Sequence, residues 1–292
     1  MTADTKTKLE LLEKLRPLDD TFIRSIFSWC SEEEKRELTE WILHAILSKE
    51  DIRITSAESQ KDMKQAAGIH SVIFDLFAGD DKETLYDVEF QKGIVHKERI
   101  LFYSYSLGIH GLAEGEDYER LRKFSMIFIT DPRLLKGVPD SIFKKGPVTE
   151  WSVSGPCDGP DFPSTGKIIL VDATYNGNDA LGDMLQDLRC SRSEEIRQPT
   201  LKRIACDLKY TKEGCERMCE LMEQYAEKRA AQAAAKAAAE AAAEATAKTR
   251  MKGIQATVRK CLAHGFTDMA LIADLAGCSL TQAETIAREY RA

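Results

Sequence analysis

The most informative pattern of apolar and polar residues in the chain lies between residues 71 and 91. Residues 71–77 (SVIFDLF) are almost all β-branched or aromatic, which is typical of a strand buried on both faces. Residues 84–91 (TLYDVEFQ) alternate instead, so that Tyr86, Val88 and Phe90 take one face of a strand and the residues between them take the other. Turn residues at 79–82 (GDDK) join the two runs, and together they predict a β-hairpin.

Helical periodicity and chain breakers predict the elements around this hairpin. Ser31 and the three glutamates after it form a helix start, and apolar residues recur at helical spacing to about residue 48. Other predicted elements are strands at 52–55, 124–130, 148–153 and 167–173, helices at 95–112, 179–189 and 196–209, a polar stretch through residue 68, and a Gly/Pro-rich loop at 154–166. The order helix, three strands, helix, strand predicts a mixed α/β core whose central hairpin is covered by helices.

The carboxyl-terminal part of the chain is predicted to be helical. Neither Gly nor Pro occurs between Gly214 and Gly253, and residues 230–247 are nearly all Ala, which favours a long solvated helix. Two short helices at 269–276 and 280–290, joined by a turn at 277–279, have the pattern of a helix-turn-helix. The second of them carries charges of both signs, which favours helix packing or self-association over DNA reading. We therefore expect three regions: an α/β domain over 1–210, a helical linker over 211–252 and a small helical module over 253–292.

Composition excludes several classes of protein. The chain has 292 residues, 43% of them apolar, which is enough to bury a sizeable core in two units of unequal size. No run of about eighteen apolar residues occurs, and residues 1–11 lack the apolar stretch of a signal peptide, so we expect a cytoplasmic protein without a membrane segment. Of the eight cysteines, only Cys215 and Cys219 share a helical spacing, and a zinc site there would lack half its ligands.

The net charge is −7, which argues against a protein that coats nucleic acid through bulk charge. The charge is uneven, since residues 227–260 contain eight basic and three acidic side chains. This stretch is basic within an acidic protein, whereas an enzyme acting on nucleic acid needs no overall positive charge.

Asp75 is the residue from which a chemical hypothesis follows. A carboxylate within an apolar strand loses its hydration unless a cation or hydrogen bonds compensate. If the hairpin turn is centred near Lys82, Glu89 lies opposite Asp75 with the two Cβ atoms about 5 Å apart. Such carboxylates repel each other unless a divalent ion binds both, and Mg²⁺ accepts oxygen ligands together with waters and substrate phosphate. The pair therefore predicts a phosphodiester site.

The neighbours of Glu89 allow two interpretations of this face. The alternation places Gln91 beside Glu89, where it would orient the attacking water or a phosphate oxygen, and it turns Lys92 to the other face. Asp87 shares the face of Glu89, however, and acidic residues on sheet surfaces are commonly just solvated. Asp172 also sits in an apolar run, yet no acidic partner lies on a neighbouring strand, so we interpret it as structural. No nucleophile elbow, phosphate-binding loop or His-Glu-x-x-His motif suggests another chemistry.

Three segments carry a resemblance to a known family. The first is residues 17–27, in which Pro17, Asp20, Phe22 and Phe27 have the spacing of that family's opening signature. The others are the hairpin 74–91 (FDLFAGDDKETLYDVEFQ) and the downstream set Arg99, Tyr103, Ser104, Gly115, Tyr118 and Leu121. From about Leu15 to Thr130 the chain resembles the Rpn family of recombination-promoting nucleases, also called PD-(D/E)XK nuclease family transposases.

This resemblance implies a fold, an activity and a set of site residues. The fold would be a restriction-endonuclease-like α/β core with a helical carboxyl-terminal extension, and the activity Mg²⁺-dependent DNA cleavage, with Mn²⁺ as a substitute. Asp75 and Glu89 would be the catalytic metal ligands, with Gln91 where the family usually has lysine. Asp20 and Arg24 match family positions near the site.

Three functional hypotheses follow. The first is a metal-dependent DNA endonuclease that promotes recombination or mobile-element activity, in which Lys92, Lys97 and Arg99 steady the DNA backbone. The second is a nuclease-like DNA-binding protein with little or no catalysis, suggested by the absent lysine and the basic helical stretch. The third is an interaction scaffold that forms homo-oligomers through its carboxyl-terminal helices.

Overall fold

The computed structural model describes residues 10–63, 72–139, 141–152 and 165–291. The chain divides into two compact units, residues 1–222 and 223–292, which are described separately below. Helix α7, Lys212–Ala263, begins in the first unit and ends in the second.

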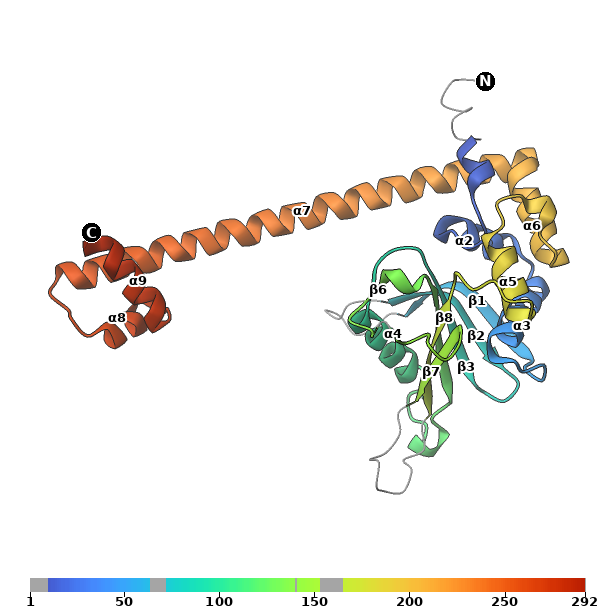
Figure 1. Cartoon of the computed structure of the whole chain (residues 1–292), viewed down its shortest axis with the longest axis horizontal. Helices are drawn as coiled ribbons and strands as arrows, with labels where there is room; N and C mark the ends of the chain where they lie inside the picture. Colours follow the sequence, from blue (N-terminus) through green and yellow to red (C-terminus); the bar gives the residue numbers. More distant parts are fainter. Residues whose placement is uncertain (1–9, 64–71, 140, 153–164, 292) are drawn as a thin grey trace. The chain divides into compact units, whose positions relative to one another are not determined.

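The first unit is built on a six-stranded mixed sheet (Figure 1). Its strand order is β1-β2-β3-β5-β8-β7, in which β1, β2 and β3 are antiparallel, β3, β5 and β8 are parallel, and β7 is antiparallel to β8. The strands are β1 Ile54–Met63, β2 Val72–Asp80, β3 Leu85–Gln91, β5 Phe124–Thr130, β7 Val148–Ser152 and β8 Gly166–Asp172. A separate pair joins β4 Val95–His96 to β6 Leu135–Lys136. The predicted mixed sheet is confirmed.

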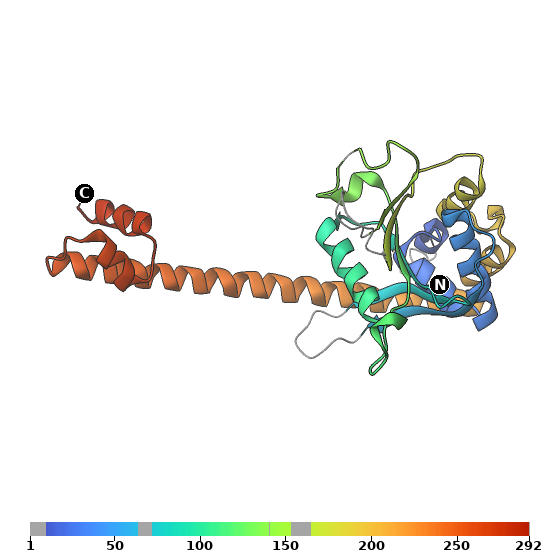
Figure 2. The same ribbon diagram turned by 90° about the horizontal axis from the view of Figure 1, so that it is seen from below.

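Helices cover both faces of this sheet (Figures 1 and 2). They are α2 Asp20–Trp29, α3 Glu32–Leu47, α4 Lys97–Ile109, α5 Ala180–Arg189 and α6 Pro199–Tyr210. Helices α2, α3, α5 and α6 pack on one face around Val88, Phe90 and Ile127. Helix α4 packs on the other face, around Phe74 and Phe128. The site described below lies on the strands between these two layers.

Most predicted elements occur where local signals placed them. Strand β5 has the predicted bounds, and α3 begins with the predicted capping box, in which Ser31 and Glu34 bond to each other's backbone. The prediction for β1 is wrong, because the strand continues to Met63 through residues expected to form a polar separator. Since β1 is the edge strand of the sheet, its polar side chains face solvent and show no alternation of apolar residues. The predicted loop at 154–166 lies mostly outside the described residues.

The ribbon of β1 and β2 exchanges its two faces at one position. Phe74 belongs to the core under α4, whereas Leu76, two residues later, belongs to the core on the opposite face. Successive residues of a regular strand alternate, so residues two apart normally share a face. The pairing of β1 with β2 keeps one register on both sides of this point, and Gln60, which lies opposite Asp75, has a left-handed backbone with φ 56°. The strands therefore twist sharply at Gln60 and Asp75.

The second unit has its own small core. Helices α8 Met269–Ala276 and α9 Leu280–Arg291 pack with the end of α7 around Val258, Ile272 and Ala283. Gly277, with φ 64°, ends α8, and reciprocal hydrogen bonds between Ser279 and Gln282 begin α9. The predicted pair of helices with its short turn is confirmed. In the described parts of the chain, no helix has an apolar stretch long enough to cross a bilayer.

Candidate active site

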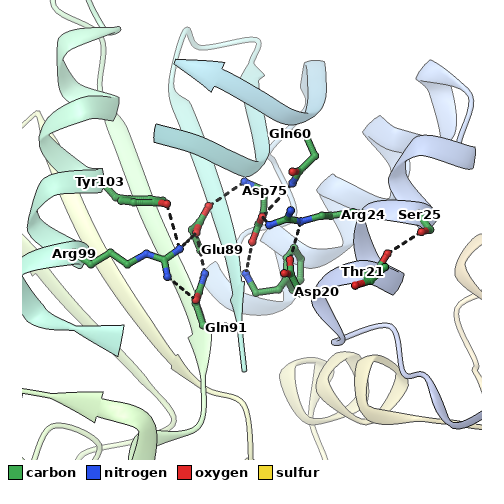
Figure 3. Close-up of polar contacts among 11 residues, drawn as sticks. Asp20, Thr21, Arg24, Ser25, Gln60, Asp75, Glu89, Gln91, Arg99 and Tyr103 are labelled. Atoms are coloured by element: carbon green, nitrogen blue, oxygen red, sulfur yellow. Dashed lines mark hydrogen bonds and ion pairs between the residues drawn. The ribbon is translucent and has the colours of Figure 1, made fainter. Parts of the chain in front are cut away.

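Asp75 and Glu89 lie side by side where β2 and β3 separate (Figure 3). The backbone pairing of these strands runs as far as Leu76 and Val88, and one step further would pair Asp75 with Glu89. At this step the side chains replace the backbone ladder. The Asp75 N–H donates to Glu89 Oε1 at 2.9 Å, and the Phe90 N–H donates to Asp75 Oδ2 at 3.2 Å. The structure thus brings together the two acids that the hairpin register predicted.

Both carboxyl groups are removed from water. Asp75 is 5% exposed and Glu89 is 1% exposed. Burial raises the pKa of Asp75, against the opposing effect of Arg24. Burial and the nearby charge of Asp75 raise the pKa of Glu89 well above its ordinary value. Two buried acids that disfavour their own ionisation form a site that a cation would stabilise.

Two arginines reach the acids from different helices. Arg24 of α2 donates from Nη2 to Asp75 Oδ1 at 3.1 Å, and its Nε lies 2.7 Å from Asp20. Arg99 of α4 has its Nη2 3.4 Å from Glu89 Oε2 and 3.2 Å from the Tyr103 hydroxyl. Arg99 thus lies directly beside a proposed metal ligand, a closer position than its predicted role on the DNA backbone required.

Two glutamine side chains complete the polar network. Gln91 donates from Nε2 to Glu89 Oε2 at 3.0 Å and accepts from Arg99 Nη1 at 3.1 Å. Gln60 donates from Nε2 to Asp75 Oδ1 at 3.2 Å. The sequence analysis missed Gln60, because its segment was predicted to be a polar separator and nothing in the residue types indicates its left-handed backbone. Tyr103 appeared there only as part of the family resemblance.

The two predicted DNA-binding lysines do not join this network. Lys92 forms an ion pair with Asp19, which precedes α2, and burial together with Arg16 lowers the pKa of Lys92. Lys97 Nζ lies 4.0 Å from Glu98, and more than half of the Lys97 side chain is exposed. Both remain near the site in sequence, on β3's end and at the start of α4.

Asp87 is buried, so the interpretation that it is simply solvated is wrong. It is 0% exposed, and neither of its carboxylate oxygens makes a hydrogen bond of ordinary geometry in the structure. Burial, followed by the nearby charges of Glu89 and Asp75, raises its pKa well above the ordinary value. Asp87 therefore adds a third acid to the electrostatics of the site without contacting the others.

The donor atoms of the site fit a small divalent ion. Carboxylate oxygens are hard ligands, and Mg²⁺ in enzymes typically binds one or two protein carboxylates while waters and substrate phosphate fill its other positions. Asp75 and Glu89 supply two such carboxylates, and their raised pKa values express a cost that a cation would reduce. Within the described residues, no three acidic, histidine or cysteine side chains are grouped to hold a metal ion. A resident ion would thus depend on these two acids.

The fold and the site together define a class of protein. A mixed sheet flanked by helices, with a buried Asp and a Glu on adjacent arms of its hairpin, is the restriction-endonuclease-like core of PD-(D/E)XK nucleases. The family model of the PD-(D/E)XK nuclease family transposases matches residues 17–146, which confirms the resemblance noted in the sequence over this region. The match indicates a nuclease-type function. Comparison with curated proteins and with solved structures gave no match.

Proposed function

We propose that the protein is a Mg²⁺-dependent DNA endonuclease, with Mn²⁺ able to substitute, that acts in recombination or in the movement of mobile elements. The observation that carries this proposal is the pair of buried carboxylates, Asp75 and Glu89, held next to each other by backbone hydrogen bonds. The family match supports the nuclease class, and the transposases of that family support the biological role.

The residues of the site have separable roles in this proposal. A bound Mg²⁺ would supply Lewis acidity toward the scissile phosphate and the attacking water. Asp75 and Glu89 hold the ion, and the Gln91 amide orients the water from beside Glu89. Lys92 and Lys97 steady the DNA backbone next to the site. Arg24 is held by Asp20 within reach of Asp75.

Nicking of supercoiled plasmid with and without Mg²⁺ tests the proposal. Asp75→Asn and Glu89→Gln should each lower the Mg²⁺-dependent rate at least about a hundredfold, because each removes a charged ligand while keeping the side-chain shape. Asp172→Asn is the matched control, since Asp172 also ends a sheet strand but bonds only to Thr174. Cleavage that survives either site change would contradict the proposal.

A DNA-binding protein without turnover is the competing function. The observation that favours it is the site itself, where Gln91 stands in the lysine position and Lys92 is paired with Asp19. In that case DNA binding would depend steeply on salt yet remain unchanged by EDTA, and no plasmid nicking would occur.

We also propose that the second unit joins copies of the chain. Leu271 and Leu275 lie one helical turn apart on α8, and they are 44% and 55% exposed. Neighbouring exposed apolar residues suit a contact between chains better than contact with DNA phosphates.

A further inference from the structure

We propose that Arg24 and Arg99 are exchangeable counter-ions of the active site. In the protein without a divalent ion they neutralise Asp75 and Glu89, and when a divalent ion binds to these acids the two arginines turn to the scissile phosphate. This inference rests on the proposed nuclease function and adds to it the groups that bind the substrate phosphate.

The first observation is the one-to-one pairing of acids with arginines (Figure 3). Arg24 Nη2 lies 3.1 Å from Asp75 Oδ1, and Arg99 Nη2 lies 3.4 Å from Glu89 Oε2. The two arginines come from α2 and α4, which pack on opposite faces of the sheet. Each acid thus has its own counter-charge, and the family's usual lysine is replaced by two guanidinium groups.

The second observation is that each pairing is a single contact. A guanidinium has five N–H donors and commonly holds a carboxylate through two parallel hydrogen bonds. Arg99 and Glu89 meet through one long contact, and Arg24 and Asp75 also meet through one. Arginines in this geometry can leave the carboxylate at a lower cost than a bidentate pair.

The third observation is that each arginine is held at a second point. Arg24 remains anchored by Asp20 through its Nε. Arg99 remains anchored by the Gln91 amide oxygen and by Tyr103, whose hydroxyl accepts a hydrogen bond and whose ring lies 4.8 Å from the guanidinium carbon. An arginine that releases its acid therefore stays beside the site with free donors.

Exposure places the arginines on the solvent side of each pair. The side chains of Arg24 and Arg99 are 33% and 40% exposed, whereas those of Asp75 and Glu89 are 4% and 1% exposed. A phosphate that approaches the site can reach the guanidinium groups before it reaches the acids. Planar guanidinium groups bind phosphate oxygens in a defined orientation, which a glutamine in the lysine position does not provide.

The charge balance gives the physical reason for the exchange. Asp20, Asp75 and Glu89 carry three negative charges when ionised, and the two arginines carry two positive charges. A divalent ion changes the sum from negative to positive, and one phosphodiester group brings it back to zero. Buried charges are tolerated when they are balanced, so metal and DNA should strengthen each other's binding through these arginines.

The test measures Mn²⁺ binding by calorimetry on the full chain without DNA. Arg24→Met and Arg99→Met should each increase the Mn²⁺ affinity about tenfold, because each removes a cation that competes for a carboxylate. The same variants should lose about a hundredfold in plasmid nicking at saturating Mn²⁺, because each removes a group that stabilises the phosphate. Arg192→Met is the control, since Arg192 pairs with Glu195 away from the site, and it should change neither quantity.

Arg99→Lys keeps the charge but loses the planar fork, which keeps the test valid if a methionine variant fails to fold. It should leave Mn²⁺ affinity within about threefold of the wild type while Ca²⁺ no longer increases affinity for a short duplex as it does in the wild type. Lower or unchanged Mn²⁺ affinity in the methionine variants would overturn the exchange while leaving the nuclease proposal intact. A wild-type chain that binds no Mn²⁺ would overturn both.

Discussion

Asp87 shows how a single residue can set the cost of the whole site. It is buried on the sheet face covered by α4, has no hydrogen bond of ordinary geometry, and lies close enough to Glu89 and Asp75 for their charges to raise its pKa. The sequence correctly placed it on the face of Glu89, but its burial depends on a helix that is distant in the pairing of the strands. Solvated and buried acids look alike in a strand pattern.

The raised pKa of Asp87 predicts a pH-dependent stability. Its folded-state pKa lies above the ordinary value of 3.8, so its protonated form stabilises the fold fully below that value. This contribution is lost as the pH rises toward the raised pKa. Asp87→Asn should therefore raise the free energy of unfolding at pH 8 by about 1 kcal/mol, or the melting temperature by about 2–4 °C, with a smaller gain at pH 5.

Thermal unfolding of the full chain at the two pH values checks this prediction. Asp81→Asn is the control, because Asp81 is an exposed acid in the same hairpin. A variant that is less stable than the wild type at pH 8, or a gain that grows toward pH 5, would show that Asp87 is not held at a cost.

At the scale of elements, the exchange of faces in the β1–β2 ribbon shapes the site. The change occurs at Gln60 and Asp75, and it takes place without a shift in the pairing register. It leaves Gln60 in a left-handed conformation that a residue with a Cβ atom rarely adopts. The hydrogen bond from Gln60 to Asp75 ties this strained position to the acid.

Substitutions at position 60 test whether the strain is real. Gln60→Gly and Gln60→Val both remove the hydrogen bond, but only valine, with its branched Cβ, is disfavoured in the left-handed region. We expect Gln60→Val to be less stable than Gln60→Gly by about 1–2 kcal/mol in urea unfolding. Equal stabilities would mean that position 60 does not require a left-handed backbone.

Elements defined by local signals were predictable from the sequence. The capping box of α3, the apolar run of β5 and the turn of the hairpin depend on neighbouring residues, and the hairpin register alone placed Asp75 opposite Glu89. The length of β1 was not predictable, because an edge strand with one solvated face carries little apolar pattern.

The surroundings of the two acids depend on tertiary contacts. Asp20 and Arg24 entered the analysis only through the family resemblance, since no spacing relates α2 to β2. Arg99 was predicted as a DNA contact, and its position beside Glu89 follows from the packing of α4 on the sheet. Side chains that meet across elements leave no periodic signal in the chain.

At the scale of the molecule, the two units are stabilised by separate sets of apolar residues. Met218 and Met222 of α7 pack against the core of the first unit, whereas Ile254 and Val258 of the same helix belong to the core of the second. Few contacts are needed between units built in this way. The site, with its acids and arginines, lies wholly in the first unit.

This separation predicts the behaviour of a chain shortened after Tyr225. It retains Met222, so its melting temperature and its Mg²⁺-dependent nicking should stay close to those of the first unit in the full chain, whereas its mass by light scattering should fall to that of a monomer. Leu271→Lys with Leu275→Lys in the full chain should lower the mass in the same way, because both changes place charge on the exposed face of α8. If both chains keep the wild-type mass, the carboxyl-terminal helices do not join copies, and loss of folding in the shortened chain would show that the first unit depends on the second.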